Sequence, residues 1–294
     1  MTDAFVTDAL VTDALVTDAA STVVHHLLAH RSIRAYRSDP VDEDVLRDCL
    51  AAGLRASSSG NMQTYSVIVT SDRALRERLF EPHMRQSMVL DAPLLLTFCA
   101  DLHRMRRWLA RSDAPDGFDD LMSFMVAAID AVLASQNVAL AAEAHGLGVC
   151  YMGSTLANCD LVGEVLELPP SVVPVVGFSL GHPAEDPAPR DRLPLDGIVH
   201  RETYQVPSDE QLDAIYAERE VRGWERYMAV PDLRARVEAA GVTNLAQLYS
   251  AVKYTRESHD AFSARVRAYL ARQGFAGDLE RGDAARADAA RGEA

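Results

Sequence analysis

The spacing of hydrophobic and polar positions predicts helices and strands that follow one another through residues 22–180. Short runs of β-branched or apolar residues are typical of strands, and four are predicted at 65–70, 93–100, 149–152 and 172–180. Between them, apolar residues recur along one helix face, as in the segment that follows Asp42. This order favours helices on both faces of a sheet, in three α/β/α layers.

Helix ends and interiors can also be predicted. The longest helix is expected at 119–145, and its apolar residues on nearly all sides predict a place inside the core. Ser21 and Asp42 are expected as caps, because short polar side chains accept bonds from the first free amides of a helix. Further helices are predicted at 72–80, 161–168, 209–227, 231–240, 245–254 and 259–273.

Composition divides the chain into four parts. Residues 2–21 repeat every five positions (TDAFV, TDALV, TDALV, TDAAS), which matches neither helix nor strand. Residues 1–21 are therefore expected to be a flexible acidic extension, with a partner-binding segment as the alternative. Residues 22–207 are predicted to form the core, ending in an extended arm from 182 that is rich in Pro, Asp and Arg. A helical extension (208–275) and a flexible tail (276–294) follow.

The charge balance restricts the partners. With 29 basic and 43 acidic residues the net charge is −14, and Lys253 is the only lysine. Nucleic-acid binding needs a basic face and membrane anchoring a polybasic segment, so neither partner is expected. The chain has no run of about 18 apolar residues, and its first residues lack the basic and apolar regions of a secretory signal, so neither a membrane span nor a signal is expected. Four cysteines without metal-ligand spacing indicate reduced thiols, and a cytoplasmic protein is predicted.

Two motifs suggest other chemistry. Residues 177–181 (GFSLG) match the G-x-S-x-G turn of serine hydrolases, which would make Ser179 a nucleophile. That turn requires a helix directly afterwards, and the following HPAEDP cannot begin one, so hydrolysis is only the alternative function. His26 and His30 stand four residues apart, as in helical metal sites, but no third ligand is near and no metal is predicted.

Three segments are suited to anions. The stretch HRSIRAYR (30–37) carries three arginines, whose guanidinium groups bind phosphate oxygens in pairs. In ASSSGNMQ (56–63), small hydroxyl residues and a glycine allow a flat ligand or a phosphate to approach the backbone. Arg190 and Arg192 follow a stretch, 112–189, without Lys or Arg. Each segment alone is also typical of a solvated loop.

Taken together, these segments resemble the nitroreductase family, and within it the branch of NADPH-dependent nitroreductases and flavin reductases. The resemblance rests on HRSIRAY, ASSSGNMQ, QNVALAAEAHGLGVCYMG and VVPVVGFSLGHPAEDPAPRDRLPLDGIVHRETYQ, in the family's order and spacing from about residue 25 to 207. It implies an α+β fold of nitroreductase type, a homodimer with FMN at the dimer interface, and NADPH or NADH as co-substrate.

The resemblance also implies FMN contacts, residue by residue. Phosphate and isoalloxazine contacts are implied for His30, Arg31, Ser32 and Arg34. Further FMN contacts are implied for Ser57, Ser58, Gln86, Tyr151, Met152, Gly153, Arg190 and Arg192. Arg219 falls where the branch places an arginine for the 2′-phosphate of NADPH. Gly60, the stretch 154–156 and the sequence after Gly223 depart from the family pattern.

The implied mechanism leaves the chemistry to the flavin, so no side chain is expected to act as acid, base or nucleophile. Arg34 is the candidate for stabilising the reduced, anionic flavin. Hydride would pass from NAD(P)H to flavin N5, and a nitroaromatic, quinone or flavin acceptor would then take its place, giving ping-pong kinetics. A flavin-binding protein with a partner-binding or sensing role is the remaining hypothesis, which NADPH turnover separates from the first.

Overall fold

A computed structural model describes residues 18–277, so the predictions for residues 1–17 and 278–294 lie outside the described residues. The chain divides into two compact units. Of the described residues, the core unit comprises 18–188 together with 265–277, and the helical unit comprises Pro189–Ala264. The helical unit thus starts within the arm, earlier than the extension predicted from residue 208, and the four-part division stays a prediction.

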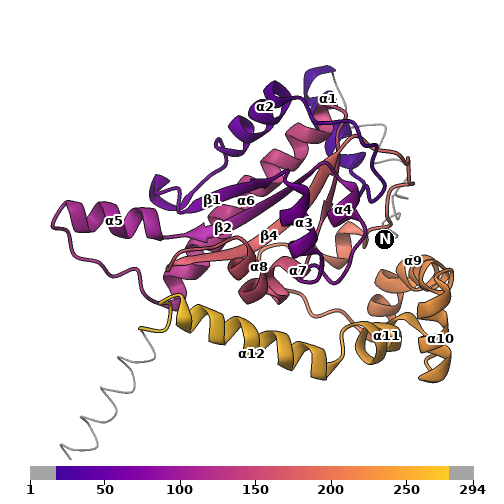
Figure 1. The fold of residues 1–294 in the computed structure, drawn as a ribbon. Helices are drawn as coiled ribbons and strands as arrows, with labels where there is room; N and C mark the ends of the chain where they lie inside the picture. The colour runs from indigo at the N-terminus through magenta and orange to yellow at the C-terminus, as the bar shows by residue number, and fades with distance from the viewer. Residues whose placement is uncertain (1–17, 278–294) are drawn as a thin grey trace, which may run out of the picture. The chain divides into compact units, whose positions relative to one another are not determined.

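One antiparallel sheet organises the core unit (Figure 1). Its strands are β1 (Tyr65–Thr70), β2 (Leu94–Asp101), β3 (Gly148–Tyr151) and β4 (Val172–Gly181), in the order β1-β2-β4-β3. All four predicted strands are confirmed, each within one residue of its observed bounds. Pro174 fits inside β4 because the pairing register with β2 shifts between Phe98 and Cys99, next to the point where Pro174 pairs.

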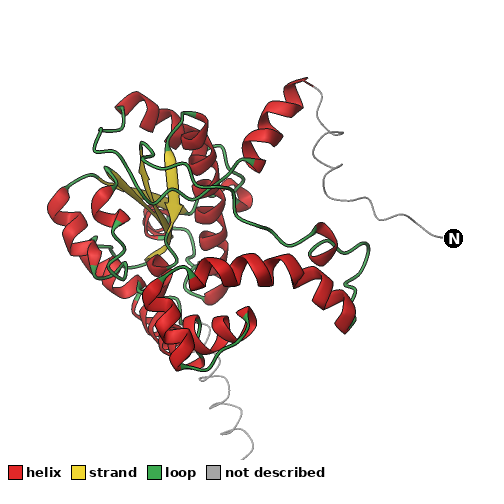
Figure 2. Ribbon diagram, turned by 90° about the vertical axis from the view of Figure 1, so that its right-hand side faces the viewer, coloured by secondary structure: helices red, strands yellow, loops and turns green. Residues whose placement is uncertain are grey.

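Helices cover both faces of the sheet, as Figure 2 shows. Leu96 and Phe98 pack with α2 (Glu43–Gly53) and α6 (Leu121–Ala144), whereas Leu95 packs on the other face, because successive strand residues point in opposite directions. The second face is covered by α3 (Arg73–Phe80), α4 (Met88–Asp91), α7 (Ser154–Ala157) and α8 (Cys159–Val165). The predicted α+β fold in three layers is confirmed.

Helix α6 is not enclosed on all sides, as its apolar composition had predicted it to be. Its buried side faces the sheet and α2, but apolar side chains on its other side are exposed, with Ile129 53% exposed. The other exposed apolar side chains of α6 are those of Leu121, Met122, Met125, Val132 and Leu133. By length and composition α6 could also span a membrane, although half of its apolar window is buried inside the protein. Its apolar residues therefore lie on two sides of the helix, of which the described chain buries one.

The local signals at helix ends were partly right. The Asp42 carboxylate accepts bonds from the amides of Asp44 (2.9 Å) and Val45 (3.2 Å), as predicted. Ser21 lies inside α1 (Asp18–Leu28), so the prediction that it caps this helix is wrong. The sequence reading also missed α4, α7 and α5 (His103–Arg111), because α4 and α7 have four residues each and α5 is strongly charged.

The helical unit has a small core of its own. It contains α9 (Asp209–Met228), α10 (Pro231–Ala239), α11 (Leu245–Leu248) and the start of α12 (Arg256–Arg272). Val237, Leu248 and Val252 are its buried centre. The helix predicted at 245–254 is instead α11 followed by the π-helical turn η4 (Tyr249–Lys253). Within residues 188–207 of the arm, the one helical element is the 3₁₀ turn η3 (Leu195–Gly197), and no strand forms there.

Candidate functional site

The loop that follows α1 is attached to the start of β3. The amide of Ile33 donates to the carbonyl of Val149 (2.9 Å), and Ser32 forms a β-bridge with the same residue. Gly148 is required here, because a Cβ atom at this position would lie 2.7 Å from the Ile33 side chain. Arg31 and Ser32 are thereby held beside the edge of the sheet.

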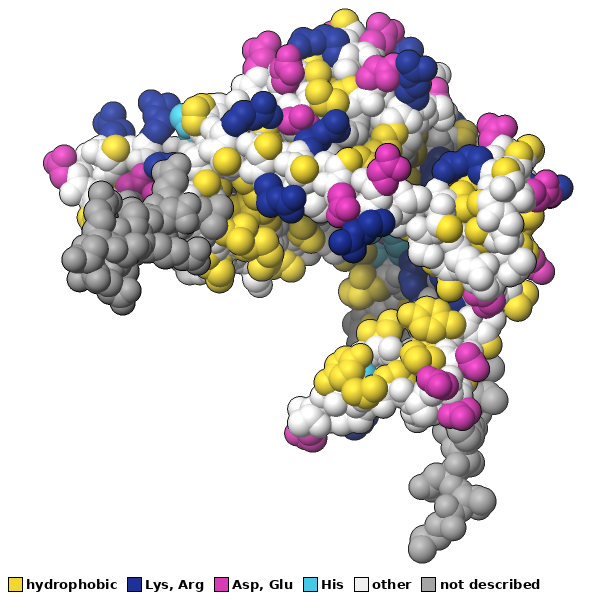
Figure 3. All heavy atoms as spheres, turned by 90° about the horizontal axis from the view of Figure 1, so that it is seen from below, with side chains coloured by type: hydrophobic (Ala, Val, Ile, Leu, Met, Phe, Trp, Pro, Cys, Tyr) yellow, Lys and Arg dark blue, Asp and Glu magenta, His cyan; other side chains and the backbone are white. Residues whose placement is uncertain are grey.

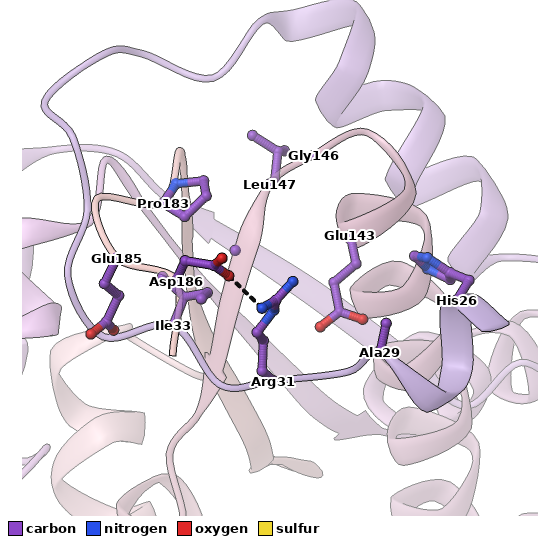
Figure 4. A pocket seen from close by; sticks show the side chains of 11 residues that line it. His26, Ala29, Arg31, Ile33, Glu143, Gly146, Leu147, Pro183, Glu185 and Asp186 are labelled. Carbon is purple, nitrogen blue, oxygen red and sulfur yellow. Dashed lines mark ion pairs between the residues drawn. The ribbon is translucent and has the colours of Figure 1, made fainter. Parts of the chain in front are cut away.

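Arg31 reaches into a pocket of about 270 Å³. Its guanidinium forms an ion pair with Asp186 and lies 3.4 Å from the carbonyl of Pro187. Figure 4 shows Arg31 between Asp186 on one side and Glu143 on the other. The pocket is also lined by Glu185, so the Arg31 guanidinium and three carboxylates share one pocket. Because the Arg31 side chain remains 38% exposed, it can exchange an exposed carboxylate partner for a ligand phosphate.

The neighbours of Arg31 have internal partners. His30 Nδ1 lies 2.6 Å from Glu143 Oε1, and His26 Nε2 lies 2.9 Å from the carbonyl of Leu140. The two histidines therefore contact α6 separately, and no group of three potential metal ligands occurs among residues 18–277. Arg34 is exposed, and its backbone amide donates a hydrogen bond to the Glu185 carboxylate.

The serine loop is held by α6. Ser58 Oγ accepts a bond from the amide of Gln63 (3.3 Å), and Ser57 is exposed. The buried carboxylate of Asp130 accepts from the amide of Ser59 (2.9 Å) and from the hydroxyl of Thr64 (3.1 Å). Sequence reasoning did not assign Asp130 to the site, although an acid in the middle of a long apolar helix was the available signal.

Arg31 and the serine loop lie at opposite ends of the sheet. The bridge to Val149 places the Arg31 loop at the end where β2 begins, because Val149 and Leu94 both pair with Leu180. The serine loop enters β1 at the other end, where the amide of Asp101 donates to the carbonyl of Thr64. At about 3.3 Å per residue, the two ends of β2 are roughly 23 Å apart. The two predicted FMN-binding segments therefore do not meet within one chain.

Gln86 and the segment after β3 do come together. The Gln86 carboxamide donates to Ser154 Oγ (3.2 Å) and to the carbonyl of His83 (2.9 Å). Gly153 precedes Ser154, and a Cβ atom at Gly153 would meet only open space within 4 Å. Met152 is buried, and Tyr151 OH lies 3.1 Å from Ser135 Oγ. A flat ligand could thus approach the backbone at Gly153 beside Gln86.

His83, which sequence reasoning missed, supports this contact. It is 1% exposed, its Nδ1 lies 3.0 Å from Ser154 Oγ, and its Nε2 has no partner. The two residues between His83 and Gln86, Met84 and Arg85, adopt left-handed backbone angles (φ 57° and 53°) that are unfavourable for side chains. Nothing in the spacing indicated that His83 and Ser154, far apart in sequence, would meet.

Burial of His83 predicts a specific acid sensitivity. Burial lowers the pKa of His83 to about 4, whereas an unfolded histidine titrates near 6.5. Above pH 6.5 the His83 side chain is neutral in both the folded and the unfolded state. Between pH 6.5 and 4 only the unfolded state binds the proton. The free energy of unfolding therefore decreases as the pH is lowered, by about 3 kcal/mol in total. Urea unfolding between pH 6.5 and 4 should show this decrease in the parent protein but not in His83→Gln.

His259→Gln, at an exposed position, is the control and should keep the decrease. The same dependence of unfolding free energy on pH in all three proteins would contradict the prediction.

The remaining predicted basic residues lie in the helical unit. Arg192 Nη1 donates to the carbonyls of Arg190 and Asp191 (both 3.2 Å). Arg219 is engaged at both terminal nitrogens, by Asp191 (2.7 Å) and by the Tyr249 hydroxyl (2.5 Å). The expected meeting of Arg190 and Arg192 with Arg31 involves both units and stays a prediction.

Ser179 has no features of a hydrolase nucleophile. It is 0% exposed inside β4, and its Oγ lies 2.8 Å from the hydroxyl of Tyr36, whose pKa is raised by burial. A serine nucleophile needs an adjacent base and access to substrate. Gly177 is explained by packing, because a Cβ atom there would lie 2.9 Å from the carbonyl of Leu96. The GFSLG motif is thus part of the core.

Comparison with known proteins supports the resemblance. The model of the Nitroreductase family matches residues 27–182, more than half of the chain. The chain belongs to this family. A curated FMN reductase (NADPH) of Bacillus subtilis is 34% identical over 194 residues, covering 65% of this chain and 77% of that protein. The family match includes the Arg31 loop, the serine loop, Gln86 and Gly153.

Two solved structures share the fold. The NfrA1 nitroreductase from B. subtilis aligns with a TM-score of 0.72 at 27% identity, covering 86% of this chain and 98% of that chain. The NADPH:FMN oxidoreductase from Vibrio harveyi, solved in complex with NAD⁺, aligns with a TM-score of 0.63 at 28% identity. The alignment covers 75% of this chain and 92% of that chain. The family's α+β fold therefore extends over most of the chain.

Proposed function

We propose that this protein is an FMN-dependent NAD(P)H oxidoreductase that reduces nitroaromatic, quinone or flavin acceptors. The observation that carries the proposal is the family match over the region that contains the Arg31 loop and the Gln86–Gly153 group. Its relative from B. subtilis is named FMN reductase (NADPH), and a structural neighbour is named NADPH:FMN oxidoreductase. The buried Ser179 gives no support to hydrolysis.

The side chains present fit FMN. The half-exposed guanidinium of Arg31 suits a phosphate, and Ser32, Ser57 and Ser58 carry hydroxyl donors. The open space beside Gly153 suits a flat ring, which the Gln86 carboxamide is placed to bind. His30, Tyr151 and Met152 are held in place by contacts with Glu143, Ser135 and the sheet, respectively.

When bound, FMN supplies the two-electron redox chemistry, and the protein binds, orients and tunes it. We propose that Arg31, Arg190 and Arg192 hold the phosphate, and that Arg34 stabilises negative charge on the reduced ring. No acid, base or nucleophile of the chain is required. Arg219 is proposed to contact the 2′-phosphate of NADPH, in competition with the carboxylate that already binds it.

We further propose a homodimer in which the Arg31 loop of one copy and the serine loop of the other bind the same flavin. The two segments lie at opposite ends of the sheet within one chain, and a second copy brings them together. The exposed apolar side of α6 and the exposed apolar residues of α1, which include Val23 and Leu28, supply surface for such contact.

The location and remaining partners follow from composition. We propose a cytoplasmic protein without nucleic-acid or membrane partners. The four cysteines are buried free thiols, as expected in a reducing compartment. Acidic and basic side chains are interspersed across the face drawn in Figure 3, an arrangement unlike the basic stripe of a nucleic-acid binder.

The proposed function predicts a yellow protein that oxidises NADPH faster when a quinone or nitroaromatic is added. Under anaerobic conditions, varying NADPH and acceptor together should give the parallel double-reciprocal lines of ping-pong kinetics. NADH measured in parallel gives the coenzyme preference. A protein that cannot be loaded with FMN would contradict the proposal, whereas FMN binding without turnover would support the flavin-binding sensor instead.

A further inference from the structure

Asp191 is the most deeply buried acid among the ion pairs of the described helical unit. Its side chain is 2% exposed, although it lies on an arm with little regular structure. Arg219 donates to Oδ2 (2.7 Å) and Arg226 to Oδ1 (2.5 Å), so each carboxylate oxygen has a guanidinium partner. A buried carboxylate is stable only with such compensation.

The two arginines come from one face of α9. Arg219 and Arg226 are seven residues apart, which is two helical turns. Arg219 is itself held by the Tyr249 hydroxyl (2.5 Å). Burial alone would raise the pKa of Asp191, but the hydrogen bond and charge of Arg219, together with the charge of Arg226, outweigh burial and lower it. The carboxylate is therefore ionised at neutral pH and binds the arm to α9.

Asp191 lies between the two arginines that are expected to bind the flavin phosphate. Arg192 donates to the carbonyls of Arg190 and Asp191 (both 3.2 Å), so the three residues form one local structure. An arginine on an extended segment loses side-chain and backbone freedom when it binds a phosphate. A fixed attachment at the residue between Arg190 and Arg192 removes part of that freedom beforehand.

We propose that Asp191 is a positioning residue for FMN, because its attachment to Arg219 and Arg226 holds Arg190 and Arg192 in the arrangement that binds the phosphate. This inference rests on the proposed function. It also implies that Arg219 serves first as an anchor of the arm and only secondarily as a contact for the coenzyme.

The direction in which one substitution changes the affinity for FMN distinguishes this role from a purely electrostatic one. Asp191→Asn removes a negative charge next to two phosphate-binding arginines, so Coulomb attraction alone predicts tighter FMN binding. The positioning role predicts the opposite, a Kd for FMN raised about tenfold, as when a charge-assisted contact is lost. Asp196→Asn is the matched control, because it removes the same charge from an exposed position on the same arm.

The experiment titrates apoprotein of the full chain with FMN and follows the quenching of flavin fluorescence, at low and at high salt. We expect Asp191→Asn to bind more weakly at both salt concentrations, and Asp196→Asn to bind as the parent or slightly more tightly. Arg226→Gln should weaken binding by a similar factor, and the double variant should be no weaker than either single one, because both substitutions break the same attachment.

Each outcome has one meaning. Tighter or unchanged binding by folded Asp191→Asn would overturn the positioning role, even if its thermal stability falls, because a purely structural residue does not alter the affinity of folded protein. Additive losses in the double variant would also overturn it. Failure of the parent protein to bind FMN at all would instead refute the proposed function.

Discussion

Replacing Arg31 with alanine is expected to weaken FMN binding by about 10- to 100-fold, the range for losing a hydrogen-bonded charge contact. The flavin content of the purified protein should fall correspondingly. The substitution should leave the fold intact, because the Asp186 side chain that Arg31 contacts is 84% exposed and stays solvated without its partner. The measurements are the ratio of flavin to protein after purification and a titration of apoprotein with FMN.

Arg37→Ala is the matched control for this prediction. Arg37 lies in the same arginine-rich segment, but it is exposed and pairs with Asp39 (2.8 Å). Its loss lowers the net charge by the same amount without touching the pocket. Equal FMN affinity in Arg31→Ala and the parent protein would remove Arg31 from the site, and equal losses in both variants would reduce its role to general charge.

Replacing Ile129 with aspartate is expected to abolish the proposed homodimer. Ile129 lies on the exposed apolar side of α6, where a charge would lose its hydration on association. Light scattering should then report a monomer, and the monomer should retain no FMN, because the serine loop of the second copy is missing. Arg47→Asp, at an exposed polar position on α2, introduces the same side chain elsewhere and should leave the dimer intact.

Mixing two variants tests directly whether two copies share a flavin site, as proposed. Arg31→Ala and Ser58→Asp should each impair FMN binding, and a refolded equal mixture should regain about one quarter of the binding sites. Half of the dimers are then mixed, and one of the two sites in each mixed dimer contains neither substitution. No recovery in a mixture that does form mixed dimers would show that Arg31 and Ser58 belong to the same site of one chain.

Local sequence signals were reliable where neighbours in the chain decide the structure. The four strands were predicted within one residue because β-branched and apolar runs have a short period and clear ends. Asp42 caps its helix because the amides that it binds are two and three residues away. Signals failed for α5, whose charge hid its periodicity, and for Ser21, which lies inside a helix that starts earlier.

Contacts between distant segments could not be derived in this way. His83 and Ser154 are 71 residues apart, and Asp130 reaches Ser59 from the middle of an apolar helix. The contact of Arg219 with the coenzyme stays a prediction, but nothing in the spacing indicated its partners within the chain, Asp191 and Tyr249. A polar side chain bonds to whatever the fold brings within about 3 Å, which spacing along the chain does not encode.

The sequence by itself determined the four strands, the longer helices of the core, the layered fold and the family, because these follow from periodicity and from motifs in a fixed order. Only the tertiary structure decided that one side of α6 is exposed and that the Arg31 loop and the serine loop lie at opposite ends of the sheet. The physical reason is that apolar composition shows how much surface is buried, whereas strand register and packing decide which side and against which partner.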